Sequence, residues 1–226
     1  MSFGPIAGII DVKDCFGWAE SAQFTGVVLN RGMIGSLSPD SPLGLVLQTF
    51  GSPALNGAED KALLIPPPRT VSIASDAVAV ELDLGGTAPG RALQAVSLVL
   101  TAYKVLAIPV LLMLKPRPDL DAVTAFTHAV RLAAELGADL VKIGLPPDVI
   151  RCVGEDLDNI RKIITLGPPL LLAGGPRTVD FSSVVSVAKR LGFQGVCVGR
   201  NVFQASDPRR ALATMREIFR DSRDEE

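Results

Sequence analysis

From residue 76 onward, short apolar runs alternate along the sequence with longer amphipathic segments. The apolar runs predict strands at 76–84, 109–115, 139–145, 169–173 and 195–199, and the amphipathic segments predict helices at 90–106, 120–136, 148–166, 180–191 and 207–219. Repeated strand-then-helix units of this length imply parallel strands that are joined by right-handed crossovers. The pattern therefore indicates an α/β fold with a parallel sheet.

The first 75 residues are less regular. Strands are predicted at 25–30 and 62–65, whereas 32–60 is rich in Gly, Ser and Pro and is interpreted as partly loop. Seven strands result, one fewer than a (β/α)8 barrel requires, and the missing one would precede Gly4. We therefore predict one domain over 1–226, a TIM (β/α)8 barrel whose first strand is shortened or missing at the N-terminus. The alternative is an open doubly wound sheet.

Composition excludes several classes of function. A net charge of -2 and a pI of about 5.5 give no basic field for nucleic acid. His128 is the single histidine, which excludes a histidine-based zinc site and Ser-His-Asp chemistry within one chain. Cys15, Cys152 and Cys197 are widely spaced without a metal-ligand pattern, as in a reducing cytoplasm. No apolar run has the length of a membrane span, and no signal peptide is evident. We expect a cytoplasmic protein with neither a nucleic-acid nor a membrane partner.

One charged residue interrupts the apolar run at 139–145. Lys142 lies next to Val141 and Ile143, and a strand buried on both faces rarely carries an ammonium unless the protein uses it. Desolvation favours the neutral amine, which can attack a carbonyl and form a Schiff base. The alternative is a lysine whose stem packs while its head reaches water. The strand by itself leaves both interpretations open.

Strand periodicity places other charged side chains on the same side as Lys142. Residues two apart share a face, so Glu81 and Asp83 lie together, and the opposite faces are apolar, as a ring of helices requires. Glu81, Asp83, Lys115 and Lys142 are therefore predicted to surround one cavity near the carboxyl end of the barrel as catalytic residues. A second ammonium would disfavour the charged form of Lys142, and a carboxylate could move protons. The alternative is a structural Lys–Glu network that closes the barrel top.

Two glycine-containing segments follow the last two predicted strands. Gly174 and Gly175 follow the strand at 169–173, and Gly199 and Arg200 follow the last strand. Glycines let backbone N–H groups approach an anion, and an arginine can clamp phosphate oxygens. Either segment alone would be a plain turn. Together, at the strands where barrels bind phosphate, they predict a phosphate site.

These features resemble those of the archaeal-type class I fructose-bisphosphate aldolases, Schiff-base enzymes related to the deoxyribose-phosphate aldolases. The same family includes autoinducer-2 processing thiolases or aldolases and aminodeoxyheptulosonate synthases. The motifs that carry the resemblance are GPIAG at 4–8, DAVAV at 76–80, AAELGADLVK at 133–142, AGGP at 173–176 and VGRNVFQ at 198–204. The resemblance implies a TIM barrel with Lys142 as the Schiff-base lysine. It also implies phosphate binding by Gly174, Gly175, Gly199 and Arg200, and a homo-oligomer that needs no metal or other cofactor.

The chain departs from the family pattern at three positions. Ser2-Phe3-Gly4 stands where family members usually carry Asp-His-Gly, so the family's catalytic aspartate is replaced by Ser2. The Tyr-Pro-Arg-Gly run that supplies a tyrosine acid begins here with Lys115. A position that is often histidine is Glu81. The nucleophile and the phosphate site are retained, whereas the proton-transfer groups have changed.

Three hypotheses follow in order of preference. The first is a Schiff-base lyase or transferase that acts on a small phosphorylated ketose or aldehyde, with Glu81 and either Asp83 or Lys115 as acid and base. The second is a catalytically impaired homologue that binds a phosphosugar as a structural or regulatory subunit. The third is a phosphosugar isomerase or epimerase, which would not use Lys142 as a nucleophile.

Overall fold

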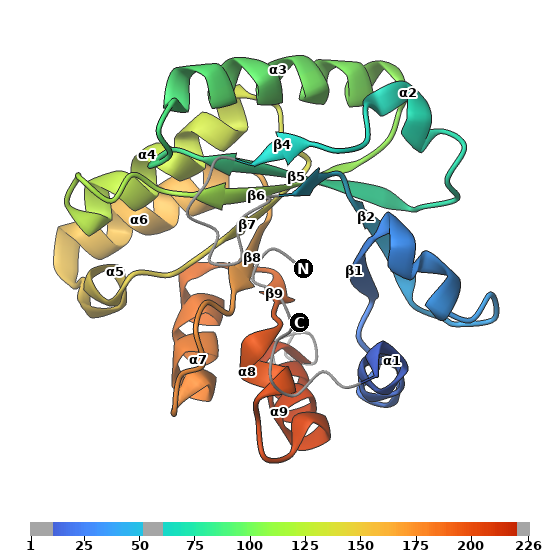
Figure 1. The fold of residues 1–226 in the computed structure, drawn as a ribbon. Helices are drawn as coiled ribbons and strands as arrows, with labels where there is room; N and C mark the ends of the chain where they lie inside the picture. Colours follow the sequence, from blue (N-terminus) through green and yellow to red (C-terminus); the bar gives the residue numbers. More distant parts are fainter. Residues whose placement is uncertain (1–10, 52–60, 221–226) are drawn as a thin grey trace.

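The computed structural model describes residues 11–51 and 61–220. Its main sheet has seven strands in the order β1-β2-β5-β6-β7-β8-β9, and every neighbouring pair is parallel. The strands are β1 (Gly26–Asn30), β2 (Gly44–Gln48), β5 (Ala77–Asp83), β6 (Val110–Lys115), β7 (Leu140–Ile143), β8 (Leu170–Ala173) and β9 (Gly195–Cys197). The sheet curls around a central axis with the helices on its convex side, as in a TIM barrel (Figure 1). The prediction of a barrel is therefore confirmed. The prediction of a shortened or missing first strand concerns residues outside the described part of the chain.

Helices follow the strands in the expected alternation. They are α1 (Val12–Ser21), the 3-10 helix η1 (Arg31–Ser36), α2 (Pro67–Thr70), α3 (Pro89–Val105), α4 (Ala122–Glu135), α5 (Pro147–Arg151), α6 (Gly154–Leu166), α7 (Phe181–Leu191), α8 (Arg200–Phe203) and α9 (Pro208–Arg220). Asp121 and Asp180 accept hydrogen bonds from first-turn amides and so begin α4 and α7. Gly192 ends α7 with φ +103°, a conformation that glycine adopts without strain.

The structure differs from the predicted strands and helices in three places. The predicted strand at 62–65 is not part of the barrel: β4 (Ala62–Leu63) pairs antiparallel with β3 (Phe50–Gly51) in a separate hairpin. The second barrel strand is β2, which lies within 32–60, the segment whose Gly, Ser and Pro content predicts a partial loop. The single helix predicted at 148–166 is divided into α5 and α6, because the backbone leaves the helical conformation at Cys152 and Val153 between them.

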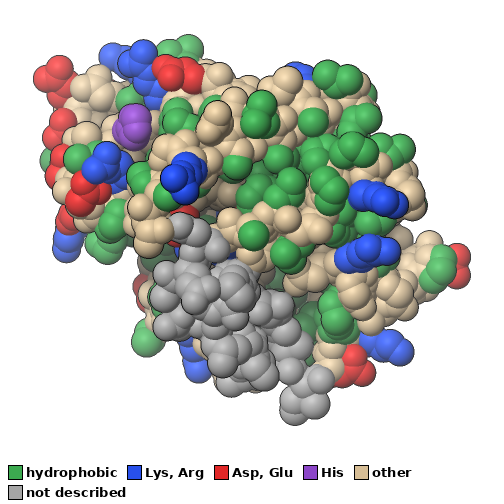
Figure 2. Space-filling model, turned by 45° about the horizontal axis from the view of Figure 1, so that its top comes forward, with side chains coloured by type: hydrophobic (Ala, Val, Ile, Leu, Met, Phe, Trp, Pro, Cys, Tyr) green, Lys and Arg blue, Asp and Glu red, His purple; other side chains and the backbone are tan. Residues whose placement is uncertain are grey.

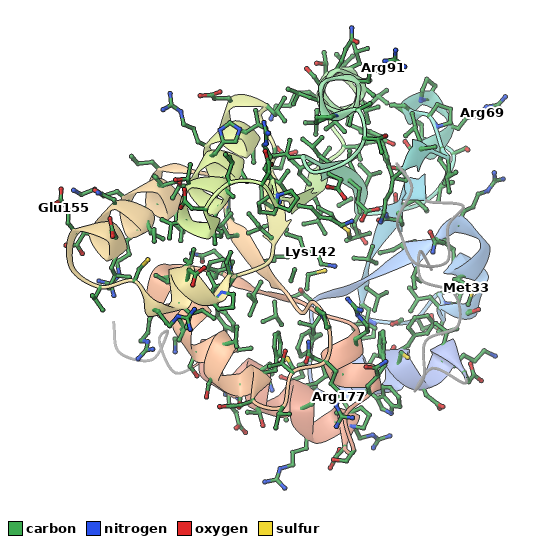
Figure 3. The ribbon with its side chains drawn as sticks, turned by 60° about the vertical axis from the view of Figure 1, so that its left-hand side comes forward. Met33, Arg69, Arg91, Lys142, Glu155 and Arg177 are labelled. Atoms are coloured by element: carbon green, nitrogen blue, oxygen red, sulfur yellow. The ribbon has the colours of Figure 1, made fainter. Side chains whose placement is uncertain are left out.

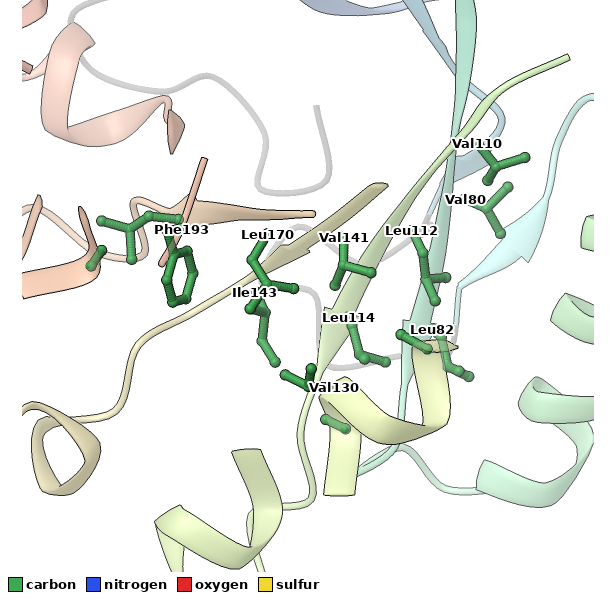
Figure 4. Close-up of a cluster of buried hydrophobic side chains, with 14 of the residues drawn as sticks. Val80, Leu82, Val110, Leu112, Leu114, Val130, Val141, Ile143, Leu170 and Phe193 are labelled. Atoms are coloured by element: carbon green, nitrogen blue, oxygen red, sulfur yellow. The ribbon is translucent and has the colours of Figure 1, made fainter. Parts of the chain in front are cut away.

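The core lies between the convex side of the sheet and the helices. Val80, Leu112, Val141 and Leu170 alternate outward along their strands and are each 0% exposed. Figure 4 shows these aliphatic side chains on the side of the sheet where α4 contributes Val130. Packing of this kind is the main source of stability and needs no polar group.

Aspartates at the amino ends of the strands fix the register of neighbouring strands. Asp76 accepts a hydrogen bond from the Leu45 amide at 2.7 Å, and Asp139 accepts one from the Val110 amide at 3.0 Å. Each of these carboxylates satisfies a backbone donor at the start of the adjacent strand. They lie at the end of the barrel that stabilises the fold, opposite the carboxyl ends of the strands.

Candidate active site

Lys142 lies on the concave face of the sheet. Its neighbours in β7, Val141 and Ile143, are 0% exposed on the convex side, so the alternation of the strand turns Lys142 inward. The side chain is half-buried, and Figure 3 shows it on the inner side of the curved sheet. In register with it are Met113 of β6 on one side and Leu171 of β8 on the other.

Glu81 lies in the same row of residues, beyond Met113. Its carboxylate contacts the Lys61 ammonium through both oxygens, with Oε1 at 2.5 Å, and it accepts a hydrogen bond from Gln48 Nε2 at 3.3 Å. The Lys61 and Glu81 side chains are only 9% and 14% exposed. A nearly buried carboxylate is retained at low cost only when it is paired and hydrogen-bonded, as Glu81 is.

Asp83 and Lys115 form a second ion pair at the ends of β5 and β6. The Lys115 Nζ lies 2.9 Å from Asp83 Oδ2, and the two side chains are 47% and 35% exposed. Asp83 Oδ1 also accepts a hydrogen bond from the Gly85 amide at 3.0 Å. Glu81 and Asp83 therefore belong to different pairs, one shielded and one close to water.

A cavity of about 450 Å³ adjoins both pairs. Glu81, Asp83 and Lys115 line it together with Met113. Lys142 is not among its lining residues and lies one strand beyond Met113. Of the four predicted catalytic residues, three thus share one cavity, and the fourth lies beside it on the concave face.

The two glycine loops follow the paired strands β8 and β9, and Asn201 joins them. Asn201 is 6% exposed, its Nδ2 donates to the Gly174 and Pro176 carbonyls, and its Oδ1 accepts from the Thr178 amide at 2.8 Å. A Cβ on Gly174 would lie 3.2 Å from that Nδ2. Gly175 adopts φ +61°, which favours glycine. Gly199 precedes α8, which Arg200 begins.

Two other polar residues, His128 and Tyr103, lie away from this face or are buried in the core. His128 is exposed on α4. Tyr103, the only tyrosine in the sequence, is 0% exposed in the core, and burial raises the pKa of its phenol. A phenolic acid is therefore not available at the concave face. Within the described residues, no cluster of three or more His, Cys, Asp or Glu side chains could hold a metal ion, and no helix is long and apolar enough to cross a membrane.

Sequence reasoning missed Lys61, Gln48 and the bridging role of Asn201. Lys61 is 20 positions from Glu81, and no periodic pattern connects them. Gln48 belongs to the strand that the sequence did not reveal. Asn201 belongs to the motif that follows the last strand, where an amide between two glycine loops offers both donors and acceptors.

The fold and the inward lysine define a TIM barrel with an amine at the carboxyl end of its sheet. A model of the DeoC/LacD family of aldolases matches residues 1–205. A curated relative, the 2-amino-4,5-dihydroxy-6-oxo-7-(phosphonooxy)heptanoate synthase of Streptomyces griseus, is 31% identical over 218 residues, which cover 91% of this chain and 76% of the relative. The class 1 fructose-bisphosphate aldolase of Thermoproteus tenax is 27% identical, over 88% of this chain and 76% of its own.

Solved structures agree with the fold. An archaeal fructose 1,6-bisphosphate aldolase superposes with a TM-score of 0.79 at 24% identity, covering 92% of this chain and 83% of the other. A second archaeal structure, in which the catalytic lysine is bound to the carbinolamine intermediate of the substrate, also has a TM-score of 0.79 at 23% identity, covering 92% and 84%. The chain belongs to the DeoC/LacD aldolase family.

Proposed function

We propose that the chain is a Schiff-base (class I) aldolase-type lyase or transferase that acts on a small phosphorylated ketose or aldehyde. The observation that carries this proposal is the inward Lys142 on β7, between two glycine loops on one side and two Lys–carboxylate pairs on the other. Membership of an aldolase family supports the same chemistry.

In the proposed reaction, the Lys142 amine attacks the substrate carbonyl to form a carbinolamine, which loses water to give an imine. A base then takes the proton of the hydroxyl group on the carbon that leaves, the carbon–carbon bond breaks, and its electron pair moves to the protonated imine. An aldehyde leaves, and the resulting enamine is protonated at carbon. Water then hydrolyses the imine and restores the amine. Synthesis follows the same steps in reverse.

Glu81 is the proposed carboxylate for proton transfer, with Asp83 or Lys115 as its partner in acid and base roles. Glu81 on β5 and Lys142 on β7 are both in register with Met113 on the intervening strand β6. Two strand spacings separate their Cα atoms by roughly 10 Å. Protons would therefore pass between Glu81 and the substrate, or through a water, rather than directly to the amine. Lys61 and Gln48 hold the carboxylate in place for this step.

We assign phosphate binding to Gly174, Gly175, Gly199 and Arg200. The β8 and β9 loops are joined by Asn201, so their backbone amides can act as one site. Phosphate sites in TIM barrels commonly use the loops after the last two strands and a short extra helix, the place that α8 occupies here.

Borohydride reduction in the presence of dihydroxyacetone phosphate tests the proposal. We expect a stable adduct on the peptide that contains Lys142, and its loss in Lys142→Met but not in the exposed control Lys13→Met. An adduct that persists in Lys142→Met, or none with any phosphorylated ketone, would reject the Schiff-base assignment. Thermal stabilisation by ligand without trapping would instead favour the impaired homologue.

We further propose that the protein acts as a cytoplasmic homo-oligomer. Large apolar side chains are exposed around α2 and α3, including Val71 at 61% and Val105 at 82%, and Figure 2 shows hydrophobic side chains gathered on this face. Exposed apolar patches often mark contacts between proteins. Light scattering on the wild type and on Val105→Lys tests this: a monomeric wild type would contradict it.

A further inference from the structure

The cavity beside the two ion pairs is mainly apolar. It opens between α3, the β3–β4 hairpin and the ends of β5 and β6. The apolar part of its wall includes Phe50, Leu63, Ala95, Leu98, Val99 and Met113. Its volume of about 450 Å³ is within the range of small-molecule sites, which are usually apolar with a few polar groups.

Among the described residues that line the cavity, the charged groups balance one another. Lys61 contacts Glu81, and Lys115 contacts Asp83, so two ammonium groups face two carboxylates. A phosphate entering this cavity would have to compete with the paired carboxylates for each lysine. The balance of charge therefore favours an uncharged occupant over an anionic one.

The cavity lies on the opposite side of Lys142 from the glycine loops. The strand order places β5 and β6 on one side of β7 and β8 and β9 on the other. Met113 belongs to the cavity wall and is in register with Lys142. A substrate with its phosphate at the β8 and β9 loops and its carbonyl carbon at Lys142 would extend its remaining end across β6 toward this cavity.

We infer that the cavity receives the body of the aldehyde partner, and that this body is uncharged and largely apolar. The inference rests on the proposed function and specifies its substrate class: a small phosphorylated ketone condenses with an apolar aldehyde. The enamine carbon of the ketone forms a bond to the aldehyde carbon, and the aldehyde oxygen takes a proton to become a hydroxyl. Hydrolysis of the imine by water releases the product and the Lys142 amine.

Competition between aldehydes tests the substrate class. With dihydroxyacetone phosphate as donor, we expect kcat/KM for hexanal to exceed that for glyceraldehyde 3-phosphate by about tenfold or more. Preference for the phosphorylated aldehyde would overturn the inference while leaving the Schiff-base proposal intact.

A cavity-filling variant tests the location. Ala95 is exposed at the cavity wall, so Ala95→Phe adds volume there without entering the core, and Ser97→Phe places the same ring elsewhere on α3. We expect Ala95→Phe to raise KM for hexanal by about tenfold with unchanged borohydride trapping of the ketone, and Ser97→Phe to change neither. An unchanged KM in Ala95→Phe would overturn the assignment of the cavity.

A binding measurement separates the cavity from the chemistry. Met113 lines the cavity, so its methyl signal in a 13C-methyl-methionine spectrum reports on occupancy. Titration with 1-hexanol should shift this signal saturably in the wild type and not in Ala95→Phe. Glycerol 3-phosphate should not shift the signal, because we expect this anion not to enter the cavity. Absence of a hexanol shift would reject the apolar occupant even if Lys142 forms an imine. If hexanol shifts the signal but borohydride traps no imine at Lys142, the cavity binds an apolar group and the proposed Schiff-base reaction is rejected.

Discussion

Lys61 shows how a single residue can support the proposed chemistry without touching the proposed nucleophile. Its ammonium meets both oxygens of Glu81, and its side chain is 9% exposed. A shielded contact of this kind restricts the carboxylate to one orientation. If Glu81 transfers protons during turnover, Lys61 is its positioning residue.

Replacing Lys61 should therefore affect turnover more than imine formation. We expect Lys61→Met to lower kcat by about tenfold to a hundredfold while borohydride trapping at Lys142 continues, because the carboxylate loses its orientation. Lys61→Arg, which keeps a cation, should recover part of kcat, and Lys13→Met should have no effect. Equal kcat in Lys61→Met and the wild type, with thermal unfolding showing both folded, would contradict this role.

Asn201 is a second single residue that positions other groups, on the other side of Lys142 from Lys61. Its amide group connects the β8 loop to the segment after β9, and it is 6% exposed. Removing it leaves carbonyl and amide groups of the β8 loop without their partner, which costs roughly 1–3 kcal/mol of stability.

We expect Asn201→Ala to raise KM for a phosphorylated ketone by about tenfold, equivalent to roughly 1.4 kcal/mol of binding. Asn201→Asp should be worse, since a carboxylate would face the Gly174 and Pro176 carbonyls instead of donating to them. The exposed Asn159→Ala on α6 is the matched control for steady-state kinetics and thermal unfolding. An unchanged KM in Asn201→Ala would show that these loops do not bind the phosphate.

At the scale of elements, β1 and β2 begin at two glycines that approach each other closely. Gly26 pairs with Gly44, and a Cβ on Gly26 would lie 2.6 Å from the Gly44 carbonyl oxygen. This contact cannot be predicted from local sequence, because it lies between two strands and only one of them has the pattern of a strand. Leu45 and Leu47 do alternate inside β2, but the surrounding Gly, Ser and Pro residues made the segment similar to a loop.

Gly26→Ala should therefore destabilise the protein by roughly 1–3 kcal/mol, since the strands must separate or shift to admit the methyl group. Gly17→Ala is the contrasting change: nothing lies within 4 Å of its Cβ position in α1, so we expect a gain of up to about 1 kcal/mol in helix propensity. Urea unfolding of the two variants measures both values. Equal stability of Gly26→Ala and the wild type would show that β1 and β2 are not paired as described.

At the scale of the whole molecule, the sequence predicted most of the fold and only part of the candidate site. Local periodicity predicted the strands from β5 onward and the inward orientation of Lys142, because alternation along a strand is a local property. The pairing of Glu81 with Lys61 rather than Lys115 could not be predicted in this way. The Lys61–Glu81 pairing depends on where the β3–β4 hairpin places Lys61 relative to the main sheet, and this position is a property of the folded chain.

The same arrangement gives the barrel two unlike sides around Lys142. Glycine loops joined by a buried amide lie toward β8 and β9, and balanced ion pairs with an apolar cavity lie toward β5 and β6. An amine between the proposed phosphate loops and a cavity is suited to hold a phosphorylated carbonyl compound in one direction.

Peptide mapping after borohydride reduction with dihydroxyacetone phosphate is the decisive test of Lys142 as the Schiff-base lysine. We expect one added ketone fragment per chain, located on Lys142 and absent from Lys142→Met. Modification of another lysine in place of Lys142, or no modification with any phosphorylated ketone, would contradict it.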